Sequence, residues 1–261
     1  MALRTTRTLL AATLLALGGL GLGACGSEGG GGDPAPTVTE TVTTGAPTSP
    51  TTPPATTPPA TTTAPATGCP AGGGGVPAGA ASRETIDVDG DGRPDTMWLN
   101  SAAGPVAFGY TTASGATFSA QVGFAGGSQP NALTARLGAE GPILAFVGNS
   151  RVVNLLTVSG CSVVPVTNPQ AQPYTFDLGF AGNGTGVGCV DVSGDSALEL
   201  VGLNVLRDAA GQPSSITRTV IQVTGTTAAN GATAQVPLTP EALASAQSVS
   251  CGEKTYANSG L

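Results

Sequence analysis

The sequence DVDGDGRPD occupies residues 87–95 and leads directly into the apolar run TMWLN at 96–100. A second version, DVSGDSALE at 191–199, leads into another apolar run. Between them, RLGAEGPIL at 136–144 occupies the equivalent place but has lost most of the acidic positions. Self-similarity at intervals of about 50 residues is typical of repeat architectures. We therefore predict three copies of one unit, each made of a loop followed by three or four strands.

The residues around these loops form short apolar runs separated by Gly, Ser, Asn and Pro. Runs of this kind indicate an antiparallel all-β domain, because strands are short and turn-forming residues end them. Helical periodicity is expected only at 240–247. The predicted strands occupy residues 95–100, 105–112, 116–124, 143–149, 152–158, 162–166, 174–180, 198–205 and 217–224.

The loop at 87–95 resembles the DxDGDGxxD loop of FG-GAP or VCBS repeats, the blades of integrin α-subunit propellers, and 191–199 resembles a degenerate copy. The resemblance implies blade-like four-stranded sheets with Ca²⁺ in the loop that enters a strand. Three units are too few for the seven-bladed ring usual in that family, and a closed propeller normally has at least about four blades. We expect a partial or small β-propeller of three to four units over residues 69–261. Either residues 70–86 and 226–258 combine into a fourth blade, or the domain is an open arc or a compact barrel-like variant.

Oxygen-bearing residues recur at alternate positions of the two acidic loops, as the hard cation Ca²⁺ requires. The predicted ligands of the first loop are the carboxylates of Asp87, Asp89, Asp91 and Asp95 and the carbonyl of Arg93. Those of the second loop are Asp191, Asp195, Glu199, the Ser193 hydroxyl and the Ala197 carbonyl. The alternative is a solvated acidic turn. The middle copy, with Arg136 first and Leu144 last, is not expected to bind.

The first 24 residues predict an export signal, with Arg4 and Arg7 before an apolar stretch that is too short for a comfortable membrane span. The tetrapeptide LGAC that ends at Cys25 resembles the lipobox of bacterial lipoproteins, which implies a lipid on Cys25 and a location on the outer side of the bacterial cell membrane. Residues 25–68 include a Thr- and Pro-rich segment that predicts a disordered tether, either a bare spacer or an O-glycosylated stalk.

Four further cysteines lie in the predicted exported domain: Cys69, Cys161, Cys189 and Cys251. An even number of cysteines in an exported chain indicates two disulfides, for which three pairings are possible. We favour Cys69 with Cys251 and Cys161 with Cys189, because the first pair flanks the folded region and would join its ends.

The amino-acid composition excludes some classes of function. The chain has no His, which excludes His-dependent catalysis, and its nine basic residues and net charge of −7 argue against nucleic-acid binding. We predict a non-enzymatic lipoprotein that presents its β domain to an unidentified envelope protein or glycan. The alternatives are a structural accessory subunit and a glycan hydrolase or lyase that uses carboxylates outside the loops, such as Glu140, Asp177 or Asp208. Trp98 is expected in the core rather than on a sugar-binding surface.

Overall fold

A computed structural model of the chain describes residues 68–102, 105–124, 126–179 and 184–261. The predicted signal peptide, the predicted lipidation site Cys25 and nearly all of the predicted tether lie outside the described residues.

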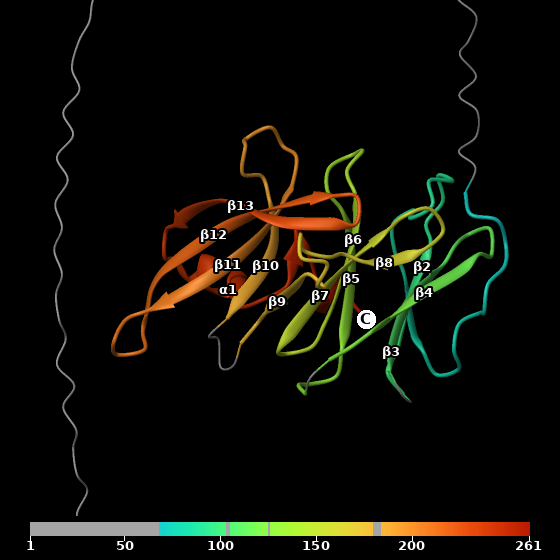
Figure 1. The fold of residues 1–261 in the computed structure, drawn as a ribbon, viewed down its shortest axis with the longest axis horizontal. Helices are drawn as coiled ribbons and strands as arrows, with labels where there is room; N and C mark the ends of the chain where they lie inside the picture. The colour runs from blue at the N-terminus through green and yellow to red at the C-terminus, as the bar shows by residue number, and fades with distance from the viewer. Residues whose placement is uncertain (1–67, 103–104, 125, 180–183) are drawn as a thin grey trace, which may run out of the picture. The chain divides into compact units, whose positions relative to one another are not determined.

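Three antiparallel sheets follow one another along the chain (Figure 1). In each sheet four consecutive strands pair in chain order, and in the second sheet a fifth strand also pairs with the third of these. The first sheet comprises β1 (Ala81–Glu84), β2 (Thr96–Asn100), β3 (Val106–Thr111) and β4 (Thr117–Val122). The second comprises β5 (Asn131–Arg136), β6 (Ile143–Gly148), β7 (Val152–Val158), β8 (Val163–Pro165) and β9 (Thr175–Asp177). The third comprises β10 (Thr185–Val190), β11 (Glu199–Arg207), β12 (Pro213–Thr224) and β13 (Thr227–Val236).

The C-terminal residues form small elements of their own: α1 (Pro240–Ser245), a separate two-stranded sheet of β14 (Ser250–Cys251) and β15 (Lys254–Thr255), and α2 (Tyr256–Ser259). Thr239 caps α1 by accepting a hydrogen bond from the Ala242 N–H, and Pro240 occupies the first turn. A Pro at that position has no N–H to leave unpaired. The helix predicted at 240–247 is confirmed, with an earlier end.

The all-β prediction is confirmed, and each of the nine predicted runs contains a strand. Sequence reasoning missed the first strand of each of the three large sheets, β1, β5 and β10, together with β13 and the short strands β14 and β15. Small and polar residues make up much of β1, β5, β10 and β13, so their apolar contrast is weak. Pairing with a strongly apolar neighbour overrides their low propensity.

The second sheet lies between the other two and shares a core with each. Side chains alternate along β6: Ile143, Ala145 and Val147 pack toward the first sheet, whereas Leu144 and Phe146 pack toward the third. All six residues of β6 are therefore buried. Full burial of a side chain such as Leu144 or Phe146 contributes about 1.5–3 kcal/mol. The outer face of the third sheet packs against α1 and its following residue, Ala246.

The described residues form an open series of three sheets, with no closed propeller. The possible fourth blade is not formed, because β1 belongs to the first sheet and β13 to the third. The C-terminal end instead reaches back to the first two sheets. Arg83 Nη1 donates to the Gly260 carbonyl at 2.8 Å, and the Leu261 N–H donates to the Ala132 carbonyl at 3.1 Å.

The two disulfides are present, but the favoured pairing was wrong. Cys69 pairs with Cys161 and Cys189 pairs with Cys251. The reason is the packing of the sheets. Cys69 lies beside the acidic loop of the first sheet, next to the turn between β7 and β8 that carries Cys161, whereas β14 brings Cys251 against β10.

The core prediction for Trp98 is confirmed, since 1% of this residue is exposed. Met97, the next residue along β2, is equally buried although it points to the opposite face. Both faces of β2 are therefore covered.

Candidate metal centre

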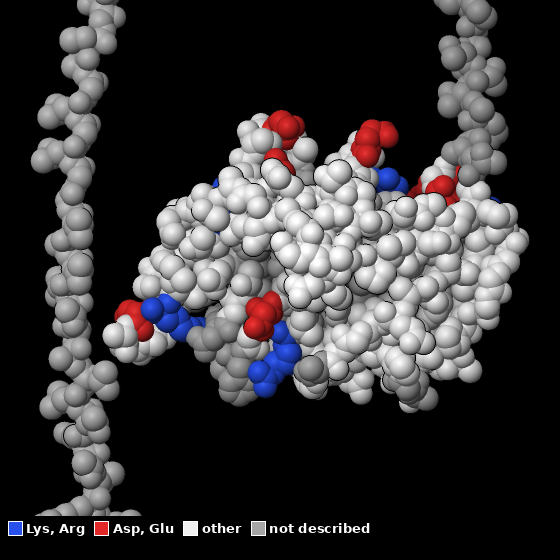
Figure 2. Space-filling view, viewed as in Figure 1, with Lys and Arg blue, Asp and Glu red and all other residues white. Residues whose placement is uncertain are grey.

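The three loops predicted from sequence occupy equivalent places in the three sheets. Each joins the first strand of its sheet to the second: β1 to β2, β5 to β6 and β10 to β11. Figure 2 shows acidic side chains along the upper edge of the domain, and further groups of acidic and basic side chains at the centre and left of the face below it. The same local topology thus produces three loops, and the acidic residues at two of them determine their chemistry.

Asp87 organises the backbone of the first loop. Its Oδ1 accepts the Gly90 N–H at 2.6 Å and its Oδ2 accepts the Gly92 N–H at 2.8 Å. Both glycines have positive φ, 79° and 84°, a conformation that only Gly adopts without a steric penalty. The Asp and Gly spacing therefore folds this turn by local hydrogen bonds.

Asp89 and Asp95 connect the loop to the surrounding fold. Asp89 Oδ2 accepts the Cys69 N–H at 2.8 Å. Asp95 is 2% exposed and accepts the Val88 N–H at 2.7 Å and the Ala113 N–H at 2.9 Å. Burial raises the pKa of Asp95, and the nearby charges of Asp89 and Asp87 raise it further, although the two backbone hydrogen bonds oppose the shift.

Three of the four predicted carboxylates of the first loop converge. One oxygen each from Asp87, Asp89 and Asp95 lies within 4.8 Å of the others. Asp91 is not a member of this described group, and its Oδ1 accepts the Arg93 N–H at 2.8 Å. The triad fits a hard cation, because oxygens at these separations can share one ion. The carbonyl ligand predicted at Arg93 stays a prediction.

The second loop repeats this bonding pattern residue by residue. Asp191 accepts from the Gly194 N–H at 2.6 Å and the Ser196 N–H at 2.9 Å, as Asp87 accepts from Gly90 and Gly92. Glu199 accepts the Val192 N–H at 2.7 Å, as Asp95 accepts the Val88 N–H. Ser196 takes the place of the second glycine with a φ of 70°. A non-glycine residue in this left-handed conformation is destabilised by about 1–2 kcal/mol. The turn forms at Ser196 despite that cost.

The converging carboxylates of the second loop are Asp191, Asp195 and Glu199, each with one oxygen within 4.8 Å of the others. Ser193 stands where the first loop has Asp89, and its hydroxyl donates to Glu199 Oε1 at 2.8 Å. A backbone hydrogen bond from Ala197 and the Ser193 hydroxyl lower the pKa of Asp195. Ser193 and the Ala197 carbonyl stay predicted ligands.

The middle loop is joined to the first one by Arg136, a contact that sequence reasoning missed. Arg136 Nη2 donates to the Asp87 carbonyl at 3.0 Å. Arg136 occupies the position of Asp87 and Asp191 in its own copy, so a cationic side chain replaces the first carboxylate ligand there. The repeat alignment places Arg136 at the right position but does not show that it points into the neighbouring sheet.

The carboxylates proposed for an enzymatic alternative do not form a pair in a described cleft. Glu140, Asp177 and Asp208 are all exposed. Asp208 accepts the Ala210 and Gln212 N–H groups and so shapes its own turn. Of five clefts lined by described residues, one includes Asp177 and none includes two of these three.

Comparison with known proteins supplies no relative. No family model matches the chain, and neither does any curated protein or solved structure. The two disulfides indicate an extracytoplasmic location, because such bonds persist in oxidising compartments. None of the helices in the described residues is both long and apolar enough to cross a membrane.

Proposed function

We propose that this chain is a membrane-anchored extracytoplasmic lipoprotein whose β domain binds Ca²⁺ at two loops and presents its surface to an envelope protein or glycan. The observation that carries the calcium proposal is the equivalence of the two loops. Each has three converging carboxylates, although Asp195 of the second loop stands at the position of Asp91 and not of Asp89, and in each the first Asp accepts the backbone N–H groups three and five residues later. The resemblance of residues 87–95 to FG-GAP loops supports the same ion.

Ca²⁺ is favoured over softer metals by the chemistry of the donors. The chain has no His, and all four cysteines of the domain are in disulfides, so imidazole and thiolate ligands are not available there. Carboxylates and carbonyls are the ligands of hard cations. A bound divalent ion also relieves the mutual repulsion of three carboxylates, which amounts to about 1 kcal/mol per pair in a water-like dielectric.

The proposed anchor and partner surface rest on separate observations. Lipidation at Cys25 rests on the sequence of residues 1–25 alone. A ligand-presenting role is supported by a cleft of about 550 Å³. Side-chain amides, hydroxyls and prolines line this cleft, which includes Asn168, Gln170, Tyr174 and Asn230. Groups of this kind bind neutral, hydrogen-bonding ligands.

The test is a calcium titration of the full-length chain with Cys25→Ser, followed by calorimetry and by thermal unfolding in Ca²⁺, Mg²⁺ and chelator. Extracellular modules bind Ca²⁺ with a Kd of about 10⁻⁴–10⁻³ M. We expect two sites in this range and a melting temperature that rises with Ca²⁺ concentration, since a ligand that binds only the native state stabilises it. The absence of both binding heat and a melting shift would overturn the proposal.

A further inference from the structure

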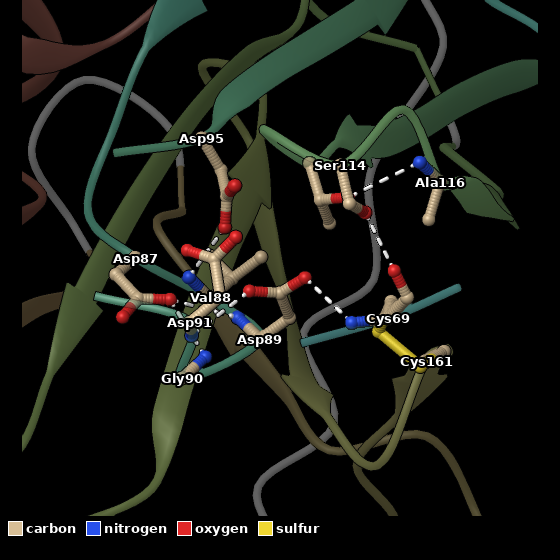
Figure 3. Close-up of a disulfide and its surroundings, with 11 residues drawn as sticks. Cys69, Asp87, Val88, Asp89, Gly90, Asp91, Asp95, Ser114, Ala116 and Cys161 are labelled. Atoms are coloured by element: carbon tan, nitrogen blue, oxygen red, sulfur yellow. Dashed lines mark hydrogen bonds between the residues drawn. A yellow bond between two sulfur atoms is a disulfide. The ribbon is translucent and has the colours of Figure 1, made fainter. Parts of the chain in front are cut away.

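The first acidic loop is held on one side by the backbone of a disulfide-bonded cysteine (Figure 3). The Cys69 N–H donates to Asp89 Oδ2 at 2.8 Å, and the Cys69 carbonyl accepts the Ser114 hydroxyl at 2.5 Å. Asp89 is one of the three converging carboxylates. A hydrogen bond to a charged acceptor is roughly twice as strong as one between neutral groups. The position of Cys69 therefore fixes the orientation of a candidate calcium ligand.

Gly68 and Cys69 pack closely against the first acidic loop. Gly68 lies against the acidic side chains, and a Cβ at this residue would stand 2.8 Å from Asp89 Oδ2 and 2.7 Å from Asp91 Cβ. Further along, the Thr117 N–H donates to the Gly72 carbonyl at 2.7 Å. Residues from Gly72 onward thus have an attachment of their own, whereas Gly68 and Cys69 depend on the loop, on Ser114 and on the bond to Cys161.

The two disulfides differ in accessibility. Cys161 is exposed in the turn between β7 and β8, although its partner Cys69 is only 3% exposed. In the other bridge, Cys189 and Cys251 are both buried. Reduction of a disulfide depends on access to a sulfur atom. A reductant in solution should therefore act first on the bridge that holds the first loop.

We propose that the Cys69–Cys161 disulfide is a redox control of the first calcium loop: the oxidised bridge holds the Cys69 N–H against Asp89, and reduction releases it and weakens Ca²⁺ binding. This inference rests on the proposed calcium function. Cys69 acts here as a positioning residue, because its backbone orients a ligand and does not itself bind the ion.

The reductant is an exported dithiol. One of its thiolates attacks Sγ of Cys161, the S–S bond breaks, and Cys69 leaves as a thiolate that takes up a proton. The second thiol of the reductant then resolves the mixed disulfide and releases Cys161 as a thiol. Two electrons and two protons pass to the protein, and the dithiol leaves as its own disulfide.

By thermodynamic linkage, Ca²⁺ binding and reduction of the Cys69–Cys161 bridge affect each other equally. If reduction weakens Ca²⁺ binding by some factor, Ca²⁺ must disfavour reduction by the same factor. Loss of one charge-assisted hydrogen bond to a ligand predicts a change of roughly tenfold in affinity. For a two-electron couple, tenfold corresponds to a midpoint potential about 30 mV more negative in Ca²⁺.

The experiment uses the full-length chain with Cys25→Ser, in which Asp195→Ala silences the second loop. Calcium affinity is measured for the oxidised protein and after equilibration in a dithiothreitol redox buffer, with alkylation and mass spectrometry to report which cysteines are reduced. The variant Cys69→Ala with Cys161→Ala removes the bridge permanently, and Cys189→Ala with Cys251→Ala is the matched control.

We expect roughly tenfold weaker binding when the first bridge is reduced or removed, and little change in the control. Equal affinity in the oxidised and reduced proteins would overturn this inference and leave the calcium function intact. Absence of binding in the oxidised protein, when the second loop is also intact, would instead overturn the proposed function. If the cysteine variant does not fold, the test is a redox titration of the native protein that compares the midpoint potential of the Cys69–Cys161 bridge in Ca²⁺ and in Mg²⁺. Equal potentials in the two ions would contradict a coupling between Ca²⁺ binding and reduction.

Discussion

Replacing Asp89 with Ser gives the first loop the residue that the second loop has at the same position. Asp89 has two roles in the structure. It is one of three converging carboxylates, and it accepts the Cys69 N–H at 2.8 Å. The substitution removes the charge and the acceptor, while the hydrogen bonds of Asp87 that shape the turn remain. The effect is expected to depend strongly on whether Ca²⁺ is present.

Without the ion, two effects oppose each other. Oxygens of Asp89, Asp87 and Asp95 lie within 4.8 Å of one another, and a pair of unit charges at that distance repels by about 0.9 kcal/mol in a water-like dielectric. Relief of two such repulsions stabilises the loop. Loss of a hydrogen bond to a charged group destabilises it by about 1.5–3 kcal/mol. We expect the free energy of unfolding in chelator to change by about 1 kcal/mol or less.

With the ion, the substitution removes a direct attraction. A divalent cation and a carboxylate oxygen about 2.4 Å apart attract by roughly 3.5 kcal/mol even in a water-like dielectric. If about 2 kcal/mol of this remains after dehydration of the ion, the affinity of the first loop falls roughly thirtyfold. Most of the stabilisation that this loop gains from Ca²⁺ should therefore disappear.

The assay is chemical unfolding in chelator and in millimolar Ca²⁺, combined with a direct affinity measurement. Glu140→Gln is the matched control, because it removes one exposed carboxylate from the middle loop. A variant that lost the same stability in chelator as in Ca²⁺ would show that Asp89 is only a structural acceptor, and the metal assignment of this loop would fail.

Three further outcomes can be checked. Ser193→Asp adds the carboxylate that the second loop lacks, so its Ca²⁺ affinity should rise at least about tenfold in calorimetry, while the melting temperature in chelator falls. Gly68→Ala forces a Cβ to within 2.8 Å of a ligand oxygen and should destabilise the protein by about 1–3 kcal/mol in denaturant unfolding. Burial raises the pKa of all three tyrosines, to about 12 for Tyr174 and further for Tyr110 and Tyr256. Because the unfolded chain loses these protons near the ordinary pKa of 10.0, stability should fall as pH rises above that value, and absorbance should show the tyrosinates of Tyr110 and Tyr256 only as the fold opens.

The acidic loops could be predicted from sequence because their structure is local. In both loops the first Asp accepts from amides three and five residues later. Residue spacing alone determines these bonds, so the turn was predictable at 87–95 and also at 191–199, where Ser196 replaces a glycine. Spacing does not determine which carboxylates converge: Asp91 lies outside the described group that Asp89 joins, and its role as a ligand stays a prediction.

The features that sequence did not reveal depend on contacts between sheets. The disulfide pairing follows from the packing of Cys69 against the turn of the second sheet, and no pattern within the chain encodes that contact. The same holds for Arg136, whose partner is 49 residues away in another sheet. The first strands of the sheets were missed because small and polar residues can join a sheet when a neighbouring strand supplies the apolar surface.

The disulfides also determine how this domain would respond to mechanical tension along the chain. They close loops with sequence separations of 92 and 62 residues, which together include most of the described residues. A force applied at the N-terminal side of Cys69 passes through the S–S bond to Cys161 and bypasses the first sheet entirely. The larger loop would otherwise release about 300 Å of contour length. In single-molecule stretching, that length stays hidden until the bridge is reduced.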